Sequence, residues 1–220
     1  MLLLAFDTAT PAVTAAVHDT DGAATLAAAD QVDGRRHGEL LLPTIDQVLR
    51  AAGVGKEQLG ALVVGTGPGP YTGLRVGLAT AAALGHALGI PVHGVCTLDG
   101  IAHAARAAGL TGPFTVATDA RRKEVYWARY DAAGRRADGP HAGHAGAIPD
   151  AVGLPVAGAG GPLYPEAFGE LIAPVYPDAG TLCGLVAQPA GQVPLLAPEP
   201  LYLRRPDARE PGPPKRVTPS

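Results

Sequence analysis

Short apolar runs separated by turn residues open the chain. Residues 2–6 are apolar, residues 12–17 alternate small or polar with apolar side chains, and a third run covers residues 23–32. The dipeptide Asp21-Gly22 between the second and third runs is a strong hairpin signal. Because strand patterns joined by tight turns pair with their neighbours, these runs predict a three-stranded antiparallel meander.

A helical period follows the meander. Five apolar residues recur with the spacing of one helix face: Leu41, Ile45, Val48, Leu49 and Ala52. Gly53 then offers a residue suited to the left-handed conformation that ends many helices. Leu40 and Leu42 add more apolar surface than one packed face needs, so we expect this helix to meet a second protein as well.

Strand and helix patterns then alternate. Strands are predicted at residues 62–64 and 91–95, and helices at residues 73–88 and 98–108. Thr72 is the candidate N-cap of the first of these helices, which Gly89 ends, and Gly109 closes the second. A meander followed by alternating strands and helices predicts an α/β protein with a mixed sheet and helices packed against it.

The second half of the chain repeats the opening plan. Strand patterns at residues 114–118 and 124–130 flank Asp119, much as the first two predicted strands flank Asp7. The similarity between residues 6–9 and 117–120 is short. It leaves open both an internal structural repeat and a single domain.

The remaining segments have weaker patterns. Gly, Ala, Pro and His dominate residues 134–155, which predicts an irregular connection. Residues 156–161 are typical of a strand that enters a tight turn, and residues 179–187 of a short helix. Residues 204–220 are rich in Pro and charge and too poor in apolar groups to fold alone, so we expect a disordered tail.

The charge of the chain argues against a strong polyanion site. Its 220 residues carry a formal net charge of −3 and have a sequence pI near 6.1, whereas binding to phosphates needs clustered Lys and Arg. The basic clusters are short and are interpreted as solvated turns: Arg35-Arg36, Arg121-Arg122-Lys123, Arg135-Arg136 and Arg204-Arg205. A role in nucleic-acid chemistry would therefore need a partner.

Cysteine usage and the apolar segments favour a cytoplasmic location. Cys96 and Cys183 are the only cysteines and lack CxxC spacing, so neither a disulfide scaffold nor a zinc ribbon is indicated. The first residues reach Asp7 before a secretory apolar region could form. The longest apolar stretch, residues 74–90, contains an arginine and a histidine and falls short of the about 20 residues of a membrane span. We expect no membrane contact.

The segment from Gly67 to Gly77, GPGPYTGLRVG, is the most distinctive in the chain. Its glycines would let backbone N–H groups approach an anion at the start of a helix, which makes Gly67 and Gly69 weak candidates for cofactor binding. The segment lacks the lysine of a P-loop and does not complete a GxGxxG fingerprint. A rigid turn that caps a helix and a contact with a partner are the other two interpretations.

Small residues recur every four positions along the helix that follows: Gly73, Gly77, Ala81, Gly85 and Gly89. Glycine inside a helix costs up to about 1 kcal/mol relative to alanine, so several glycines together indicate that another backbone approaches closely. The neighbour is either the chain's own sheet or first helix, or a helix of another subunit. The sequence alone does not separate these two interpretations.

Few residues suit catalysis. Asp7, at the end of the first strand, either holds a metal-bound phosphate or forms an Asx turn, which aspartate favours. His141 and His144 form an HxxH pair in a Gly/Ala/Pro loop without supporting ligands, so no metal site is predicted. Ser220 is the only serine, which excludes a serine hydrolase, and no catalytic residue is predicted.

Six segments taken together resemble the bacterial TsaB (YeaZ) family: residues 4–9, 37–43, 67–77, 119–121, 124–127 and 200–204. The loop is the most specific of them, since the family pattern is close to GPGSFTGLRIG. This chain has Pro70 in place of the serine and Tyr71 in place of the phenylalanine, so a role that needs a hydroxyl group at Pro70 is excluded.

This resemblance implies the α/β fold of actin, Hsp70 and the sugar kinases (ASKHA), with two ribonuclease H-like lobes that each contain a mixed five-stranded sheet. The N-terminal lobe would comprise residues 1–110 and would carry the partner-binding helices. Residues 111–203 would form a smaller C-terminal lobe, followed by the tail.

The resemblance also implies a non-catalytic scaffold or dimerisation subunit. It would bind the catalytic subunit TsaD, with the ATPase TsaE, in threonylcarbamoyl transfer to N6 of adenosine 37 of tRNAs that read ANN codons. The tRNA would bind only through the complex, no cofactor would be firmly bound, ATP or ADP could sit at the complex interface, and the isolated chain could form a homodimer. Two helices would contact TsaD through seven residues: Leu41, Ile45, Leu74, Gly77, Leu78, Ala81 and Gly85.

Two other functions stay open as alternatives. Catalytic relatives resemble TsaD in an HxxxH metal pair, which falls on Thr97 and Ile101 here; Ile101 has no donor atom, so an M22-type metallopeptidase is disfavoured. An independent small-molecule kinase or ATPase would use Asp7 with the glycine turns at Gly67 and at residues 158–161. Binding and turnover of Mg-ATP by the isolated chain would favour this kinase or ATPase.

Overall fold

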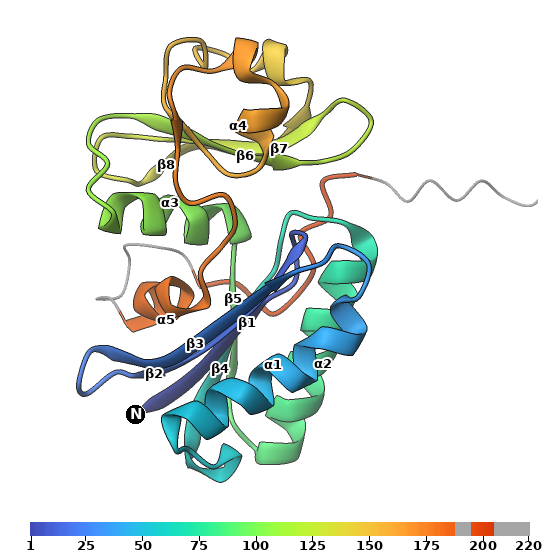
Figure 1. The fold of residues 1–220 in the computed structure, drawn as a ribbon, viewed down its shortest axis with the longest axis vertical. Helices are drawn as coiled ribbons and strands as arrows, with labels where there is room; N and C mark the ends of the chain where they lie inside the picture. Colours follow the sequence, from blue (N-terminus) through green and yellow to red (C-terminus); the bar gives the residue numbers. More distant parts are fainter. Residues whose placement is uncertain (188–194, 205–220) are drawn as a thin grey trace, which may run out of the picture.

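The computed structural model describes residues 1–187 and 195–204, which form two mixed five-stranded sheets with helices packed against them (Figure 1). The first sheet begins with the predicted meander of β1 (Leu2–Asp7), β2 (Ala12–Asp19) and β3 (Ala24–Val32). β4 (Leu59–Gly65) pairs parallel with β1, and β5 (Val92–Val95) pairs parallel with β4. The resulting order, β3-β2-β1-β4-β5, confirms the prediction of a mixed sheet.

The second sheet repeats this plan. β6 (Phe114–Asp119) pairs antiparallel with β7 (Val125–Tyr130) and parallel with β9 (Val156–Ala157), just as β1 pairs with β2 and β4. β8 (Arg136–Gly143) and β10 (Leu171–Ile172) complete the order β10-β9-β6-β7-β8. Of the two interpretations that the sequence left open, the internal structural repeat is the observed one.

Strand β8 corrects the prediction of an irregular connection over residues 134–155. It lies at the edge of the second sheet, and its register against β7 shifts near Arg129. Pro140 is tolerated within it because an edge strand leaves one row of backbone groups unpaired. The strand escaped prediction because Gly and Pro are depleted in most strands.

Helices cover both faces of the first sheet (Figure 1). α1 (His37–Ala52) and α2 (Tyr71–Leu88) pack on one face, and α5 (Ala179–Ala187) packs on the other. Leu4 and Phe6 of β1 face the first pair of helices, whereas Leu3 and Ala5 face α5, as the two-residue period of a strand requires. None of the described helices is long and apolar enough to cross a membrane.

Helix α2 starts earlier than predicted, and α1 begins before the first residue of its apolar period. α1 begins at His37, where the buried ring donates a hydrogen bond from Nε2 to the carbonyl oxygen of Thr10 at 2.7 Å and so anchors the first turn. α2 begins one residue before Thr72, which is therefore not its N-cap, and no side chain caps this end. The predicted ends are confirmed, because Gly53 and Gly89 both adopt the left-handed conformation.

Helix α3 (Thr97–Ala107) lies between the two sheets and packs on the second (Figure 1). Its Leu98 and Ile101 share one core with Phe114 of β6. The predicted boundary after residue 110 falls between the sheets, but it places α3 with the first sheet and α5 with the second. In the structure α3 packs on the second sheet and α5 packs on the first, because the chain enters the second lobe before α3 and returns to the first lobe before α5.

The last described segment connects the lobes. A backbone bridge joins Leu196 to Gly94 of β5. Further on, Arg204 donates to the carbonyl oxygen of Ala120 at 2.7 Å and pairs with the Glu124 carboxylate, both in the second lobe. Arg204, which the sequence assigned to the tail, therefore packs on the folded body. Residues 205–220 lie outside the described residues.

Candidate functional site

Asp7 ends β1 at the point where the first sheet meets the loop of residues 67–77 and the start of α3. Its Oδ1 accepts the N–H of Ala9 at 2.6 Å, which is the predicted Asx turn, and its Oδ2 accepts the hydroxyl group of Thr97 at 2.6 Å. Burial raises the pKa of the Asp7 carboxyl above its ordinary value, and these two hydrogen bonds oppose the rise. Both carboxyl oxygens are thus engaged by the chain itself.

The glycine-rich loop closes over this carboxyl group. Gly67 donates its N–H to the Thr97 hydroxyl oxygen at 3.1 Å, and Thr97 returns its own N–H to the Gly67 carbonyl oxygen at 2.8 Å. A Cβ atom at Gly69 would collide with the carbonyl group of Ala9 in the turn between β1 and β2. These glycines therefore allow backbone to approach backbone, which favours the interpretation of the loop as a rigid turn.

The small residues of α2 pack against the chain's own first sheet. A Cβ atom at Gly77 would collide with the hydroxyl group of Thr8, and one at Gly85 would collide with Val92 of β5. The Thr8 hydroxyl also donates to the carbonyl oxygen of Gly73 at 2.7 Å. Of the two neighbours considered for the small-residue stripe, the chain's own sheet is the one observed.

This packing corrects the choice of partner-facing residues. All seven are buried inside the chain: Leu41, Ile45, Leu74, Gly77, Leu78, Ala81 and Gly85. The apolar period that selected them is the core-facing period of an amphipathic helix, so they do not form an outer surface. A partner that meets α1 and α2 has to contact the opposite faces of these helices.

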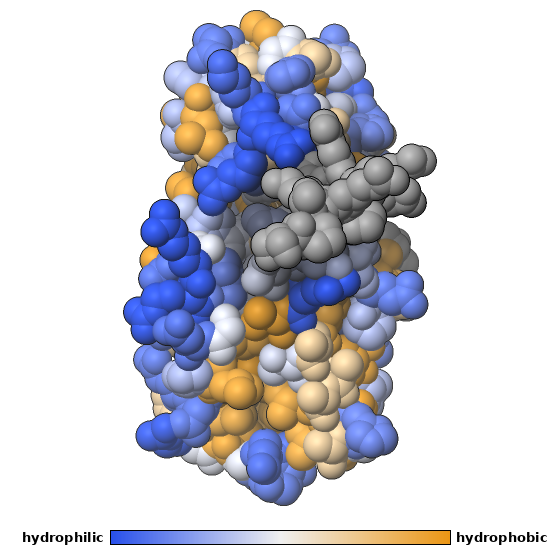
Figure 2. Space-filling model, turned by 90° about the vertical axis from the view of Figure 1, so that its right-hand side faces the viewer, coloured by the Kyte–Doolittle hydropathy of each residue, from blue (hydrophilic) through white to orange (hydrophobic). Residues whose placement is uncertain are grey.

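Some apolar side chains between α1 and α2 are not fully buried, although α1 also exposes Asp46 and Arg50, which pair with each other. The helices approach each other at Gly38 and Val76, and helical spacing from these two residues places further apolar groups along the same seam. We name this seam the α1–α2 surface and define it by Leu42, Leu49, Val76, Ala79, Thr80 and Ala83. Leu42 is 57% exposed, and Figure 2 shows hydrophobic side chains gathered over the lobe that carries these helices.

The second lobe has a counterpart of the Asp7 turn. Asp119 ends β6, and its Oδ1 accepts the N–H of Arg121 at 2.7 Å, again two residues further on. The Arg121 guanidinium pairs with the other carboxyl oxygen at 3.2 Å, and the Asp119 side chain is 21% exposed. Gly158 and Gly160 pack on the backbone of Ala117, as Gly69 packs on the first turn. The glycines of residues 158–161 thus serve close packing too.

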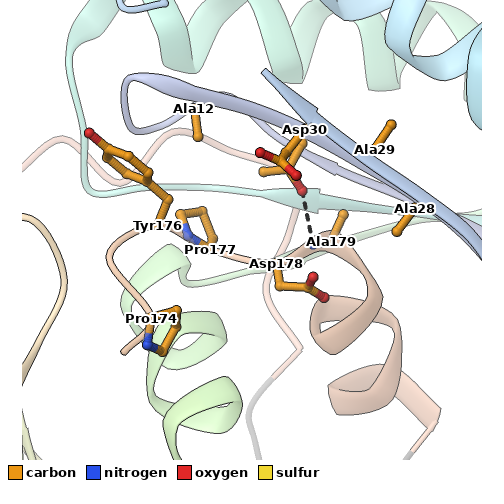
Figure 3. A pocket seen from close by; sticks show the side chains of 10 residues that line it. Ala12, Ala28, Ala29, Asp30, Pro174, Tyr176, Pro177, Asp178 and Ala179 are labelled. Carbon is orange, nitrogen blue, oxygen red and sulfur yellow. Dashed lines mark hydrogen bonds between the residues drawn. The ribbon is translucent and has the colours of Figure 1, made fainter. Parts of the chain in front are cut away.

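A pocket of about 280 Å³ lies where residues 174–179 pass the first sheet (Figure 3). Asp30 of β3 and Asp178 before α5 line it, together with the ring of Tyr176. Two of its lining residues are bonded to each other, since the hydroxyl oxygen of Thr14 in β2 accepts the N–H of Ala179 in α5 at 2.9 Å. Sequence reasoning missed this pocket because segments far apart in the chain form it, and no local pattern signals their meeting.

The residues considered for metal binding have other contacts. Thr97 is bonded to Asp7, and Ile101 is buried in the core beneath α3. The His141 ring pairs with the Asp138 carboxylate at 2.8 Å. Within residues 1–187 and 195–204, no group of three or more His, Cys, Asp or Glu side chains is arranged to hold a metal ion.

Comparison with known proteins identifies related sequences. Residues 31–166 match the family model described as TsaD: tRNA N6-adenosine threonylcarbamoyltransferase. An uncharacterised Mycobacterium tuberculosis protein is 46% identical over 209 residues, which cover 94% of this chain and 93% of that protein. An uncharacterised Mycobacterium leprae protein is 48% identical over 94% of this chain. The Escherichia coli tRNA threonylcarbamoyladenosine biosynthesis protein TsaB is 37% identical over 130 residues, 59% of this chain. The aligned region spans only about half of these last two relatives, 56% and 55% of their lengths.

Solved structures confirm the fold. YeaZ from Pseudomonas aeruginosa superposes with a TM-score of 0.72 at 30% identity, covering 84% of this chain and 89% of that one. A second Pseudomonas aeruginosa structure, described as an uncharacterized protein with similarity to peptidase YEAZ, has a TM-score of 0.78 at 29% identity. It covers 92% of this chain and 99% of that chain. The chain therefore shares its two-sheet α/β architecture with these proteins.

Proposed function

Because the chain belongs to the TsaB (YeaZ) family, we propose that it acts in biosynthesis of tRNA threonylcarbamoyladenosine as a non-catalytic subunit that binds TsaD. The Escherichia coli relative carries this pathway in its name, and the matching family model is that of the transferase. The observation that carries the proposal is the partly exposed α1–α2 surface, on which Leu42, Ala79 and Ala83 are open to solvent.

The likeness of the chain to TsaD suggests how the two would assemble. Two chains of related fold can pair about an approximate two-fold axis, each using the same surface. In this arrangement α1 and α2 of the chain meet the corresponding helices of TsaD. The same surface would let two copies of the chain associate when TsaD is absent.

The finer features of the proposed function come from the family. The complex would transfer threonylcarbamoyl to N6 of adenosine 37 in tRNAs that read ANN codons, with TsaE supplying ATPase activity. ATP or ADP would sit at the junction of the subunits, and the complex would work in the cytoplasm. The engaged state of the Asp7 carboxyl and the packing of Gly67 and Gly69 support a subunit that leaves chemistry to its partner.

Reconstitution with matched surface variants tests the proposal. Leu42→Glu and Ala83→Glu place a carboxylate on the α1–α2 surface without touching the core, unlike changes at Gly77 or Ala81, which would disrupt packing. Val152→Glu is the control, because Val152 is a 79% exposed apolar residue in the second lobe. We expect both surface variants to lose co-purification with TsaD and threonylcarbamoyladenosine formation, while Val152→Glu keeps both.

The reconstitution also separates the alternatives. Wild-type levels of assembly and modification in both surface variants would contradict the proposed interface. Calorimetry of the isolated chain with Mg-ATP tests the kinase or ATPase alternative, because tight binding accompanied by turnover would replace the scaffold function. Stoichiometric metal in the purified protein together with peptide hydrolysis would support a metallopeptidase instead.

A further inference from the structure

Two tyrosines form a stacked pair on the surface between the lobes. Tyr71 at the start of α2 and Tyr202 in the last described segment have ring centroids 5.2 Å apart and ring planes inclined by 24°. The guanidinium carbon of Arg75 lies 3.8 Å from the centroid of the Tyr71 ring, and its Nε donates to the Tyr202 hydroxyl at 3.4 Å. Each tyrosine residue is 43% exposed, and Arg75 is exposed as well. The group thus presents aromatic surface and a cation to solvent.

A basic hairpin lies next to this pair. Arg204 follows Tyr202 by two residues and is bonded to Ala120 and Glu124, so a short stretch of chain links the turn between β6 and β7 to the tyrosine pair. The tip of this turn consists of three exposed residues with positive φ angles of 62°, 55° and 63°: Arg121, Arg122 and Lys123. The N–H of Ala120 donates to the Glu124 carbonyl oxygen at 3.0 Å and closes the turn. The three side chains are therefore presented from a hairpin of defined geometry.

The charge of this region differs from that of the whole chain. Asp119 pairs with Arg121, and Glu124 pairs with Arg204. Arg75 and Lys123 stand beside these two pairs, so the described residues named here include more cations than anions, although the net charge of the chain is −3. The basic clusters were predicted to be separate solvated turns, whereas the fold brings Arg204 to the turn that carries residues 121–123, and Tyr202, two residues before Arg204, contacts Arg75.

We propose that this basic aromatic surface, made of Tyr71, Arg75, Arg121, Arg122, Lys123 and Tyr202, binds RNA directly. It deepens the proposed function, on which it rests, by giving this chain its own contact with the tRNA substrate. Cations contact the phosphate groups, and an unpaired base stacks on the tyrosine and guanidinium planes. Exposed aromatic faces beside arginine favour RNA over an acidic protein, because bases offer a π-face that carboxylates lack.

Fluorescence anisotropy with a labelled tRNA transcript that has an unmodified adenosine 37, measured over a salt series, tests the surface. The probe is titrated with the full chain, alone and mixed with TsaD. The charge variant is Arg122→Ser with Lys123→Ser, and its matched control is Lys56→Ser with Arg135→Ser, which removes two exposed cations elsewhere. Tyr202→Ala removes the stacking ring, and Tyr202→Phe retains it.

We expect the charge variant to bind the transcript about tenfold more weakly and to lower the salt slope by about 1 to 2 units. Tyr202→Ala should weaken binding about tenfold, Tyr202→Phe should restore it, and the control pair should match wild type. Wild-type affinity in the charge variant, no RNA binding by wild type alone or with TsaD, or equally tight binding of poly-glutamate would each overturn the inference.

Assembly is measured on the same variants, which keeps the two proposals apart. Loss of RNA binding with intact TsaD assembly supports the surface within the proposed function. If wild type fails to bind TsaD while its RNA binding still responds to the variants as expected, the partnership fails and the RNA surface stands.

Discussion

The two lobes share one strand order and an aspartate at the same position, yet the two turns are built differently. In each lobe the carboxylate accepts the N–H two residues further on. Asp7 is fully buried beneath the loop of residues 67–77 and bonded to Thr97, whereas Asp119 is partly exposed and paired with Arg121. The repeated topology reproduces the turn itself. The segments that surround each turn decide whether its carboxyl is a core group or a surface group.

The largest losses of stability are expected at the glycines behind the turns. Gly69→Ala would drive a Cβ atom into the Ala9 carbonyl group and should cost about 3 kcal/mol of unfolding free energy. Gly160→Ala, whose Cβ would lie 2.8 Å from that of Ala117, should cost less, about 2 kcal/mol. Urea unfolding measures both.

The control for these glycines is Gly146→Ala, since no atom lies within 4 Å of a Cβ at Gly146. It should stay within about 1 kcal/mol of wild type. An equal loss at Gly146 and Gly69 would show that close approach to the Ala9 carbonyl group does not set the cost.

The next largest losses of stability are expected when each of the two aspartate carboxylates is removed. Asp7→Ala leaves the buried Thr97 hydroxyl and Ala9 N–H without their acceptor and should cost about 2 kcal/mol. Asp119→Ala should cost less than about 1 kcal/mol, because its ion pair with Arg121 is largely solvated. Thermal unfolding compares the two variants. Equal losses would contradict the distinction between a core turn and a surface turn.

The pH dependence of stability should run in opposite directions in the two lobes. Burial raises the pKa of Asp7, so its contribution is full below the ordinary carboxyl pKa of about 4 and is lost as pH rises through the folded-state pKa. Wild type should therefore lose stability relative to Asp7→Asn as pH rises. In the second lobe, the hydrogen bond from His141 lowers the pKa of Asp138, so the smaller advantage of wild type over Asp138→Asn should vanish as pH falls. Parallel trends for the two Asn variants across a pH series of unfolding curves would contradict these assignments.

The smallest effect is expected from the two thiols, which report on both lobes. Cys183 lies in the core between α5 and the first sheet, and Cys96 in the core beneath α3. Burial raises the pKa of each thiol to about 12, so both should resist alkylation at neutral pH until the protein opens. Mass spectrometry after iodoacetamide labelling gives the rates. Rapid labelling of one cysteine in the native protein would show that its lobe opens independently.

Local patterns predict most of the fold. The meander, both long helices and their glycine ends follow from apolar periods and turn residues that need no distant partner. The exchange of α3 and α5 between the lobes could not be predicted in this way. Which sheet a helix covers depends on contacts between segments far apart in the chain. The apolar face of a helix does not indicate which of the two sheets it packs on.

The candidate site was predicted less well for the same reason. The Asx turn at Asp7 is local and is confirmed, but its bond to Thr97 joins residues 90 positions apart. Leu41 and Ile45 were selected by the period that marks the core, so the α1–α2 surface has to be sought outside this period, on the side of the helix where Leu42 lies. Patterns of this kind show that a helix has an apolar face. They do not show whether protein or solvent meets it.

Hydrogen exchange of the chain with and without TsaD tests the central claim, that the outer faces of α1 and α2 bind a partner, most directly. The account predicts slower exchange across α1 and α2 in the complex, with β8 and residues 145–157 unchanged. Protection confined to the second sheet, with α1 and α2 exchanging as in the isolated chain, would contradict it.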